Sequence, residues 1–218
     1  MKVQDVLSAT TPPLKMDDTV EEALGQLMEY RVRHLPVVED DTLVGILSEE
    51  QMMDAPGPDA TLRALVRPNP VSARPEQHIF DAAQVMVKHD LSTLPVAGPD
   101  EAYVGLIRRH DIFDSFAQML ATQEAGAILA LEVAPRDYAL AKLVHLIEQN
   151  DAKVLAVASE PAEEGTKKKR VTLKLNVNDA ARVRHVLEHN GYRIVASFGE
   201  EDDEMSERVQ AFMRYLEV

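Results

Sequence analysis

An internal repeat most constrains the fold of this 218-residue chain, because two copies of one unit must bury their apolar faces against each other. The segments HLPVV from His34 and TLPVA from Thr93 are 59 positions apart. The offset becomes 60 where LVGIL around Gly45 corresponds to YVGLI around Gly105, so the intervening loop holds one insertion. An apolar stripe at helical spacing precedes each copy: Val20, Ala23, Leu24, Leu27 and Met28, repeated as Ile79, Ala82, Ala83, Met86 and Val87.

Each copy predicts a helix, a short strand, a turn, a second strand and another helix. Thr19 before the first stripe, with Glu22 three residues later, predicts a capping box. The apolar runs 35–38 and 43–47, separated by the polar residues 39–42, predict two strands and a tight loop. Two such units packed face to face leave matched clefts between them, where pockets tend to form.

The second half of the chain has a different pattern. Residues 128–133 and 154–158 are continuous apolar runs, and 171–177 and 192–198 alternate as strands do. Helical stripes lie between them: Leu140, Leu143, Val144 and Ile147, then Ala180, Val183 and Leu187. Gly191 follows as the residue after the second helix. The order βαββαβ predicts an antiparallel sheet with both helices on one face.

The segments TVEEALGQLMEYRVRHLPVVEDDTLVGILSEEQ and HIFDAAQVMVKHDLSTLPVAGPDEAYVGLIRRHD resemble a tandem pair of CBS domains, the Bateman module, over roughly residues 1–120. The following βαββαβ order resembles an ACT domain, and the whole architecture resembles acetoin-utilisation proteins of the AcuB type. We therefore expect an α+β fold: a CBS pair in 1–124, with copies at about 1–60 and 61–124, and a ferredoxin-like ACT domain in 125–199. An amphipathic helix is expected in 200–218.

That last segment opens with the acidic run EEDDE and continues with apolar residues at helical spacing, Met205, Val209, Phe212, Met213 and Leu216. Acidic residues suit the first turn of a helix. The stripe must be buried on its own domain or on a second subunit, and we favour contact in a homodimer. The helix that begins near Asp111 presents the same two alternatives.

The resemblance implies a nucleotide motif where strand passes into helix: glycine, a hydrophobic residue, any residue, serine or threonine, two residues, then aspartate. A carboxylate can accept bonds from both ribose hydroxyls, while a hydroxyl and first-turn amides can hold phosphate oxygens. GILSEEQ keeps Ser48 but has Gln51 in place of the aspartate, and GLIRRHD keeps Asp111 but has Arg108 in place of the hydroxyl. Neither copy is complete.

The second copy is the better candidate for an adenine nucleotide site, since Asp111 would hold the ribose and Arg108 or Arg109 a phosphate. An adenine slot would be lined by Val71, Ser92, Thr93, Leu94 and Pro95. A weaker first site would use His34, Leu35, Pro36, Ser48 and Gln51. The alternative role for Asp111 is the N-cap of the next helix, and for the two arginines a solvated pair. The expected ligands are AMP, ADP, ATP or S-adenosylmethionine, with Mg²⁺ accompanying a nucleotide.

The amino-acid composition limits the classes of partner that we expect. The 23 basic and 37 acidic residues give a net charge of −14, which repels phosphate backbones and anionic lipids, so neither nucleic acid nor membrane is expected. With no cysteine, disulfides and thiol catalysis are excluded. The apolar runs are too short for a signal peptide or a membrane span, and we expect a cytoplasmic protein. The acidity is also compatible with adaptation to salt.

Other clusters of charged or metal-binding residue types are weaker candidates for a functional site. His185 and His189 have the spacing of a metal pair but lack a third ligand, so an exposed face is expected. A solvated hairpin tip is expected for the basic run Lys167, Lys168, Lys169 and Arg170. The acidic run 200–204 could attract Mg²⁺ or simply begin a helix. In the ACT-like half, Pro135, Arg136 and Asp137 replace the Pro-Gly element that brings backbone close to an amino acid, which argues against amino-acid binding there.

The leading hypothesis is a non-catalytic, homodimeric regulator that binds an adenosine ligand in the CBS cleft and signals to an unidentified partner protein. The alternatives are a ligand-free docking scaffold and an amino-acid sensor acting through the ACT-like half. An enzyme is the least favoured alternative, because no residue set offers a nucleophile, a base and an orienting partner.

Overall fold

The computed structural model describes residues 1–163 and 165–199 and divides the chain into two compact units, Met1–Ser115 and Phe116–Val218. The division falls inside helix α4 (Arg109–Met119), shortly before the domain boundary expected from the sequence. The segment 200–218, with its expected helix and acidic run, lies outside the described residues. Among the described helices, none combines the length and the apolar character needed to cross a bilayer.

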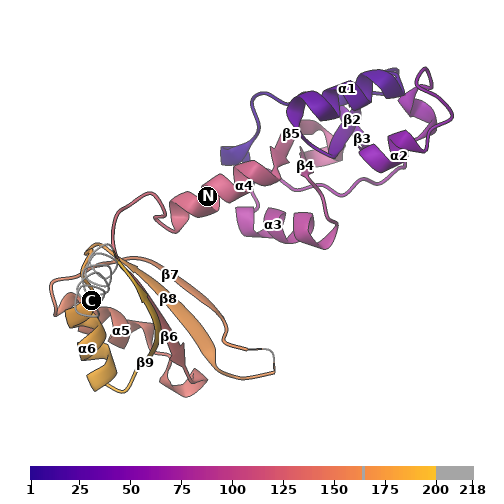
Figure 1. Cartoon of the computed structure of the whole chain (residues 1–218). Helices are drawn as coiled ribbons and strands as arrows, with labels where there is room; N and C mark the ends of the chain where they lie inside the picture. The colour runs from indigo at the N-terminus through magenta and orange to yellow at the C-terminus, as the bar shows by residue number, and fades with distance from the viewer. Residues whose placement is uncertain (164, 200–218) are drawn as a thin grey trace, which may run out of the picture. The chain divides into compact units, whose positions relative to one another are not determined.

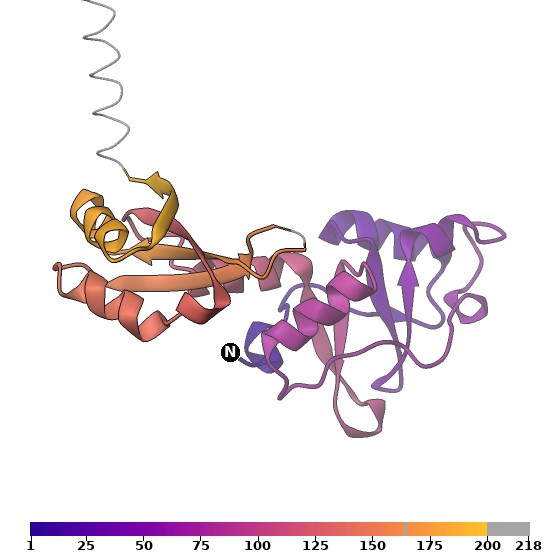
Figure 2. The same cartoon turned by 90° about the horizontal axis from the view of Figure 1, so that it is seen from below.

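The first unit contains the two predicted copies, which can be followed by colour in Figures 1 and 2. The first copy consists of η1 (Val3–Val6), β1 (Leu14–Lys15), α1 (Val20–Tyr30), β2 (His34–Glu39), β3 (Thr42–Ser48), α2 (Glu49–Met53) and η2 (Leu62–Ala64). The second consists of α3 (Ile79–Lys88), β4 (Thr93–Ala97), η3 (Pro99–Glu101), β5 (Tyr103–Arg108) and α4. The predicted helix, strand, strand, helix order is confirmed in both.

Sheet pairing repeats between the copies. Strands β2 and β3 are antiparallel with Val37 opposite Gly45, and β4 and β5 are antiparallel with Val96 opposite Gly105. Each pair shifts register immediately after that position. A short parallel neighbour joins each sheet, β1 beside β2 and Ala73 beside Val96. The same local irregularities recur at the repeat offset, so the two copies share one backbone plan.

The helices bury most of the predicted stripes. Val20, Ala23 and Leu27 of α1 and their counterparts in α3 are buried, as expected. Met28 and Val87 are instead 78% and 80% exposed, which corrects the stripe at its last position. Position i+8 lies about 80° around a helix from position i, so it falls at the edge of the packed face. The predicted capping box is confirmed, because Thr19 Oγ1 accepts from Glu22 N at 3.2 Å and Glu22 Oε2 accepts from Thr19 N at 2.9 Å.

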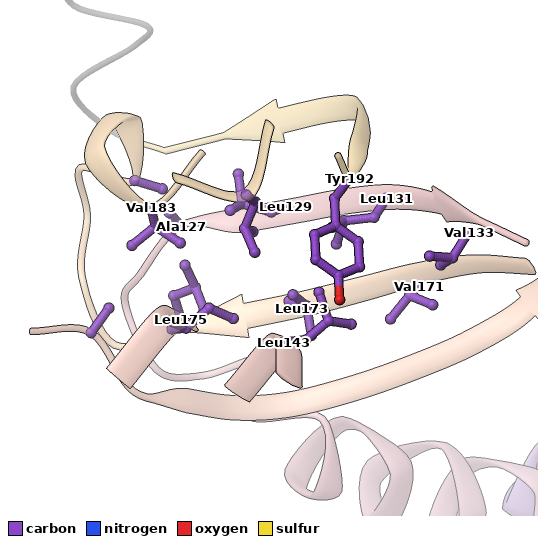
Figure 3. Close-up of a cluster of buried hydrophobic side chains, with 14 residues drawn as sticks. Ala127, Leu129, Leu131, Val133, Leu143, Val171, Leu173, Leu175, Val183 and Tyr192 are labelled. Carbon is purple, nitrogen blue, oxygen red and sulfur yellow. The ribbon is translucent and has the colours of Figure 1, made fainter. Parts of the chain in front are cut away.

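The second unit has the predicted order βαββαβ: β6 (Ile128–Val133), η4 (Pro135–Asp137), α5 (Leu140–Glu148), β7 (Val154–Pro161), β8 (Lys169–Leu175), α6 (Ala181–His189) and β9 (Arg193–Phe198). Its sheet has the order β7-β8-β6-β9 with every neighbouring pair antiparallel. Both helices cover one face of the sheet (Figure 1), and their apolar side chains belong to the same buried cluster as those of the strands. Tyr192 lies in this core with Leu131 and Leu173 (Figure 3). The α+β fold class is confirmed.

Candidate functional site

The two copies meet where β2 and β4 begin. Ser92 Oγ accepts hydrogen bonds from the backbone N–H groups of Arg33, at 2.9 Å, and His34, at 3.0 Å. Thr93 Oγ1 donates to the carbonyl of His34 at 2.8 Å. One backbone bond recurs within each copy at the repeat offset: Glu49 N donates to Arg33 O in the first, and Arg109 N donates to Ser92 O in the second, both at 2.9 Å. These bonds fix the geometry of the clefts on either side of the junction.

His34 is held neutral at this junction. Its Nδ1 accepts from the backbone N–H of Ser92 at 3.2 Å, so a proton on Nδ1 would face another donor. Burial lowers the pKa of His34, and the positive charge of Arg33 lowers it further. The ring is therefore an acceptor between the copies at neutral pH.

Two cavities flank the junction. Cavity A, of about 630 Å³, is lined by Tyr30, Arg31, Val32, Arg33, Ser92, Arg108, Arg109 and His110. Cavity B, of about 310 Å³, is lined by Arg33, His34, Ser48, Glu49, Glu50, His89 and Asp90. Nearly every residue of one list lies 59 or 60 positions from a residue of the other. The cavities are therefore the matched clefts that the repeat predicts.

The residue pairs at the two strand-to-helix turns act as caps. Ser48 Oγ accepts from Gln51 N at 3.2 Å, and Gln51 Oε1 accepts from Ser48 N at 3.0 Å. In the second copy Asp111 Oδ2 accepts from Arg108 N at 2.9 Å. Asp111 is thus the third residue of α4 and not its N-cap, which corrects that alternative for its role. The backbone of the turn is the same in both copies although the side chains differ.

Arg108 also places its guanidinium on the carboxylate of Asp111. The Nη2 to Oδ1 distance is 2.7 Å and the Nε to Oδ2 distance is 3.0 Å, so both carboxylate oxygens are occupied. The two side chains are 28% and 17% exposed, and the hydrogen bonds raise the pKa of Arg108. The two residues that the sequence assigned to phosphate and ribose are bound to each other in this structure.

The remaining predicted residues are distributed unevenly. Ser92 and Arg109 line cavity A with Arg108, whereas Thr93 and Leu94 have no exposed surface. Neither Val71, which is half-buried, nor buried Pro95 lines this cavity. At the first site His34 and Ser48 line cavity B, and Leu35 and Pro36 are buried in β2.

Five residues that complete cavity A were not selected from the sequence: Tyr30, Arg31, Val32, Arg33 and His110. Asp90, which lines cavity B, was not selected either. Asp90 accepts from Arg109 Nη2 at 3.0 Å and Arg33 Nη2 at 3.4 Å, and these arginines lower its pKa. The signal available in the sequence was the offset itself, because Arg31 corresponds to Asp90 and Arg33 to Ser92. Residues at the end of a helix in one copy face the turn of the other.

The described residues contain no cluster of side chains that could bind a metal ion. Within 1–163 and 165–199, no three histidine, aspartate or glutamate side chains gather as a metal site would require. His185 and His189 both lie on the exposed side of α6.

Curated relatives match between half and three quarters of this chain. A homoserine O-acetyltransferase of Methanohalobium evestigatum is 30% identical over 112 residues, which is 50% of this chain and 23% of the relative. An inosine-5′-monophosphate dehydrogenase of Korarchaeum cryptofilum is 24% identical over 156 residues, which is 72% of this chain and 32% of that enzyme. The chain thus spans a third or less of the length of these relatives.

A solved structure, CBSX2 in complex with AMP, is 24% identical with a TM-score of 0.48, and the match covers 54% of this chain and 96% of that one. The family model described as CBS domain matches residues 3–57 and 62–118. These two matches coincide with the two copies and together cover just over half of the chain. The chain therefore belongs to the CBS domain family and carries a tandem CBS pair.

Proposed function

We propose that this protein is a non-catalytic regulator that binds an adenine nucleotide in cavity A. The observation that carries the proposal is the lining of the cavity, where Arg31, Arg33, Arg108 and Arg109 surround the start of α4. Guanidinium groups and the first amides of a helix are the donors that phosphate oxygens prefer. Membership of the CBS family supports a regulatory module over an active site.

Nucleotide binding would exchange the partners of Arg108. A ligand phosphate would take the guanidinium, and the released Asp111 carboxylate would accept from the ribose hydroxyls. One charge-assisted contact is lost and others form, so the exchange leaves no buried carboxylate unpaired. Tyr30 and Val32 supply the apolar surface of the cavity against which an adenine ring would lie.

We further propose that the protein forms a homodimer through the first unit. A dimer interface would be the surface through which ligand binding is transmitted to a partner. Two exposed apolar positions recur at the repeat offset. Met28 and Val87 are 78% and 80% exposed, and Met53 and Phe113 are 72% and 68% exposed. Large apolar side chains exposed at equivalent points of both copies favour burial against a second copy. Ligand binding that prefers one dimer arrangement would shift its population by the difference in affinity.

A second candidate function is carboxylate sensing by the second unit. A cavity of about 480 Å³ lies beside the loop after β6, and Arg136, Lys142 and Arg193 line it with Asp137 and Asn190. Cationic groups beside a carboxylate and an amide suit a small molecule that carries both charges, such as an amino acid. The missing glycine in the loop remains the argument against it.

Isothermal titration calorimetry of the purified full chain tests the proposal, with AMP, ADP, ATP and S-adenosylmethionine, each with and without Mg²⁺. The Asp111→Ala variant is expected to lose affinity for every adenosine ligand. Gln51→Ala is the matched control, because Gln51 occupies the equivalent position in the other copy. Absence of heat with all four ligands at millimolar concentration would instead favour the docking scaffold, and heat with amino acids alone would move sensing to the second unit.

A further inference from the structure

The two cavities are copies by backbone but opposites by charge. Four arginines and no carboxylate line cavity A, whereas one arginine and three carboxylates line cavity B. The contrast arises at equivalent positions of the repeat: Arg31 corresponds to Asp90, Arg108 to Ser48, Arg109 to Glu49 and His110 to Glu50. A ligand therefore meets opposite electrostatic potentials in two clefts of the same construction.

The positive charge of cavity A is only partly compensated. Arg108 is paired with Asp111 at 2.7 Å, and Arg33 and Arg109 share Asp90. Within residues 1–163 and 165–199, the side chain of Arg31 has no ion pair or hydrogen bond. Two carboxylates thus serve four guanidinium groups, which leaves cavity A with an excess of positive charge that an anionic ligand would balance. This excess of positive charge stands in a chain with a net charge of −14.

From this contrast we infer that the chain binds one adenosine di- or triphosphate, in cavity A, and that cavity B excludes nucleotides. The inference rests on the proposed nucleotide function and adds its ligand class and stoichiometry. Each further phosphate adds negative charge and acceptor oxygens, which Arg31 and Arg33 can bind while Arg108 holds the phosphate nearest the ribose. In cavity B, the carboxylates of Glu49 and Glu50 repel the same phosphates, and Asp90 is already paired with Arg33 and Arg109.

Arg31 offers a clean test because the fold already tolerates an acidic residue at the equivalent position. Arg31 has φ 54° and caps α1, and Asp90 has φ 48° at the matching point of the second copy. Aspartate and asparagine both accept this left-handed conformation. Arg31→Asp and Arg31→Asn therefore change the charge of cavity A with little strain, and circular dichroism spectra matching the parent confirm the fold.

The experiment is calorimetry of the full chain with ATP, ADP, AMP and inorganic tripolyphosphate. We expect one ATP per chain, bound about tenfold more tightly than AMP, an increment typical of one charge-assisted hydrogen bond. Arg31→Asn should remove most of the preference for ATP over AMP, and Arg31→Asp should reverse it. Lys167→Asp is the control, since it makes the same change in net charge at an exposed loop of the second unit.

Each outcome decides a separate point. Equal affinities for AMP and ATP, or two nucleotides per chain, would overturn the inference and leave nucleotide binding intact. A preference for ATP that Arg31→Asp leaves unchanged would also overturn it. Tripolyphosphate binding as tightly as ATP would keep the charge argument but remove the adenosine specificity of the proposed function. Failure of all the adenosine ligands and of tripolyphosphate would refute both.

Discussion

Ser92→Ala removes one of the side chains that join the two copies. The hydroxyl oxygen accepts from Arg33 N at 2.9 Å and from His34 N at 3.0 Å, and it lies 3.2 Å from His34 Nδ1. Alanine leaves both amides without this acceptor and removes one partner of the His34 ring. The backbone of β4 itself is unchanged, so the loss falls on the junction between the copies.

The magnitude follows from the environment of the two amides. A buried donor left without an acceptor costs about 1–3 kcal/mol, and the lower end applies where water can reach it. The bond to Arg33 lies at the surface and the bond to His34 is half-buried, so we assign about 1 kcal/mol to each. The unfolding free energy of the first unit should fall by about 2 kcal/mol, which lowers its melting temperature by roughly 8 °C.

Hydrogen–deuterium exchange of the ligand-free full chain measures this locally, since peptides spanning residues 31–38 report the two amides. An increase of about 30-fold in their exchange rate corresponds to about 2 kcal/mol. Ser92→Thr keeps the hydroxyl and should exchange as the parent does. If Ser92→Ala lowers the free energy that protects these amides by less than about 0.5 kcal/mol, water satisfies them and the serine does not hold the copies together.

Three further predictions concern other parts of the chain. The lowered pKa of His34 makes the native state bind fewer protons than the unfolded state, so stability should be full above the unfolded pKa, near 6.5, and decline as the pH falls from about 7 to 5; urea denaturation at each pH should show the slope, and His34→Gln should remove it. Gly126→Ala would place a Cβ 1.9 Å from Leu175 O at φ 147°, so it should destabilise the second unit by more than about 3 kcal/mol; normal exchange protection of β6 in this variant would contradict the clash. Thr19→Ala should lower the unfolding free energy by about 1 kcal/mol through loss of the cap, and an unchanged denaturation midpoint would show that the cap contributes nothing.

The sequence was sufficient for the repeat and for the order of elements. Periodicity is a local property, and the stripe of α1, its capping box at Thr19 and the paired strands around Gly45 appear in the structure as predicted. The βαββαβ order of the second half was also correct, since each strand and helix there carries its own apolar pattern. Local pattern fixes an element because the residues that decide it are neighbours along the chain.

The candidate site was only half visible in the sequence. The motif at each strand-to-helix turn identified Arg108 and Asp111, but a motif does not show that one side chain occupies both oxygens of the other. Thr93 and Leu94 belong to a segment of the expected slot, yet both are fully buried, and the hydroxyl of Thr93 is bonded to the carbonyl of His34 in the other copy.

Patterns that are local in the sequence therefore determined the repeat, the secondary structure and the turns that carry the motif. The tertiary structure alone decided the composition of the two cavities, because packing the copies about their junction brings the end of α1 to the turn before α4. That crossing places Arg31 and Arg33 beside Arg108 and Arg109, residues more than seventy positions away in the sequence. The opposite charge of the two equivalent clefts is a property of side chains brought together from both copies, and no single copy contains it.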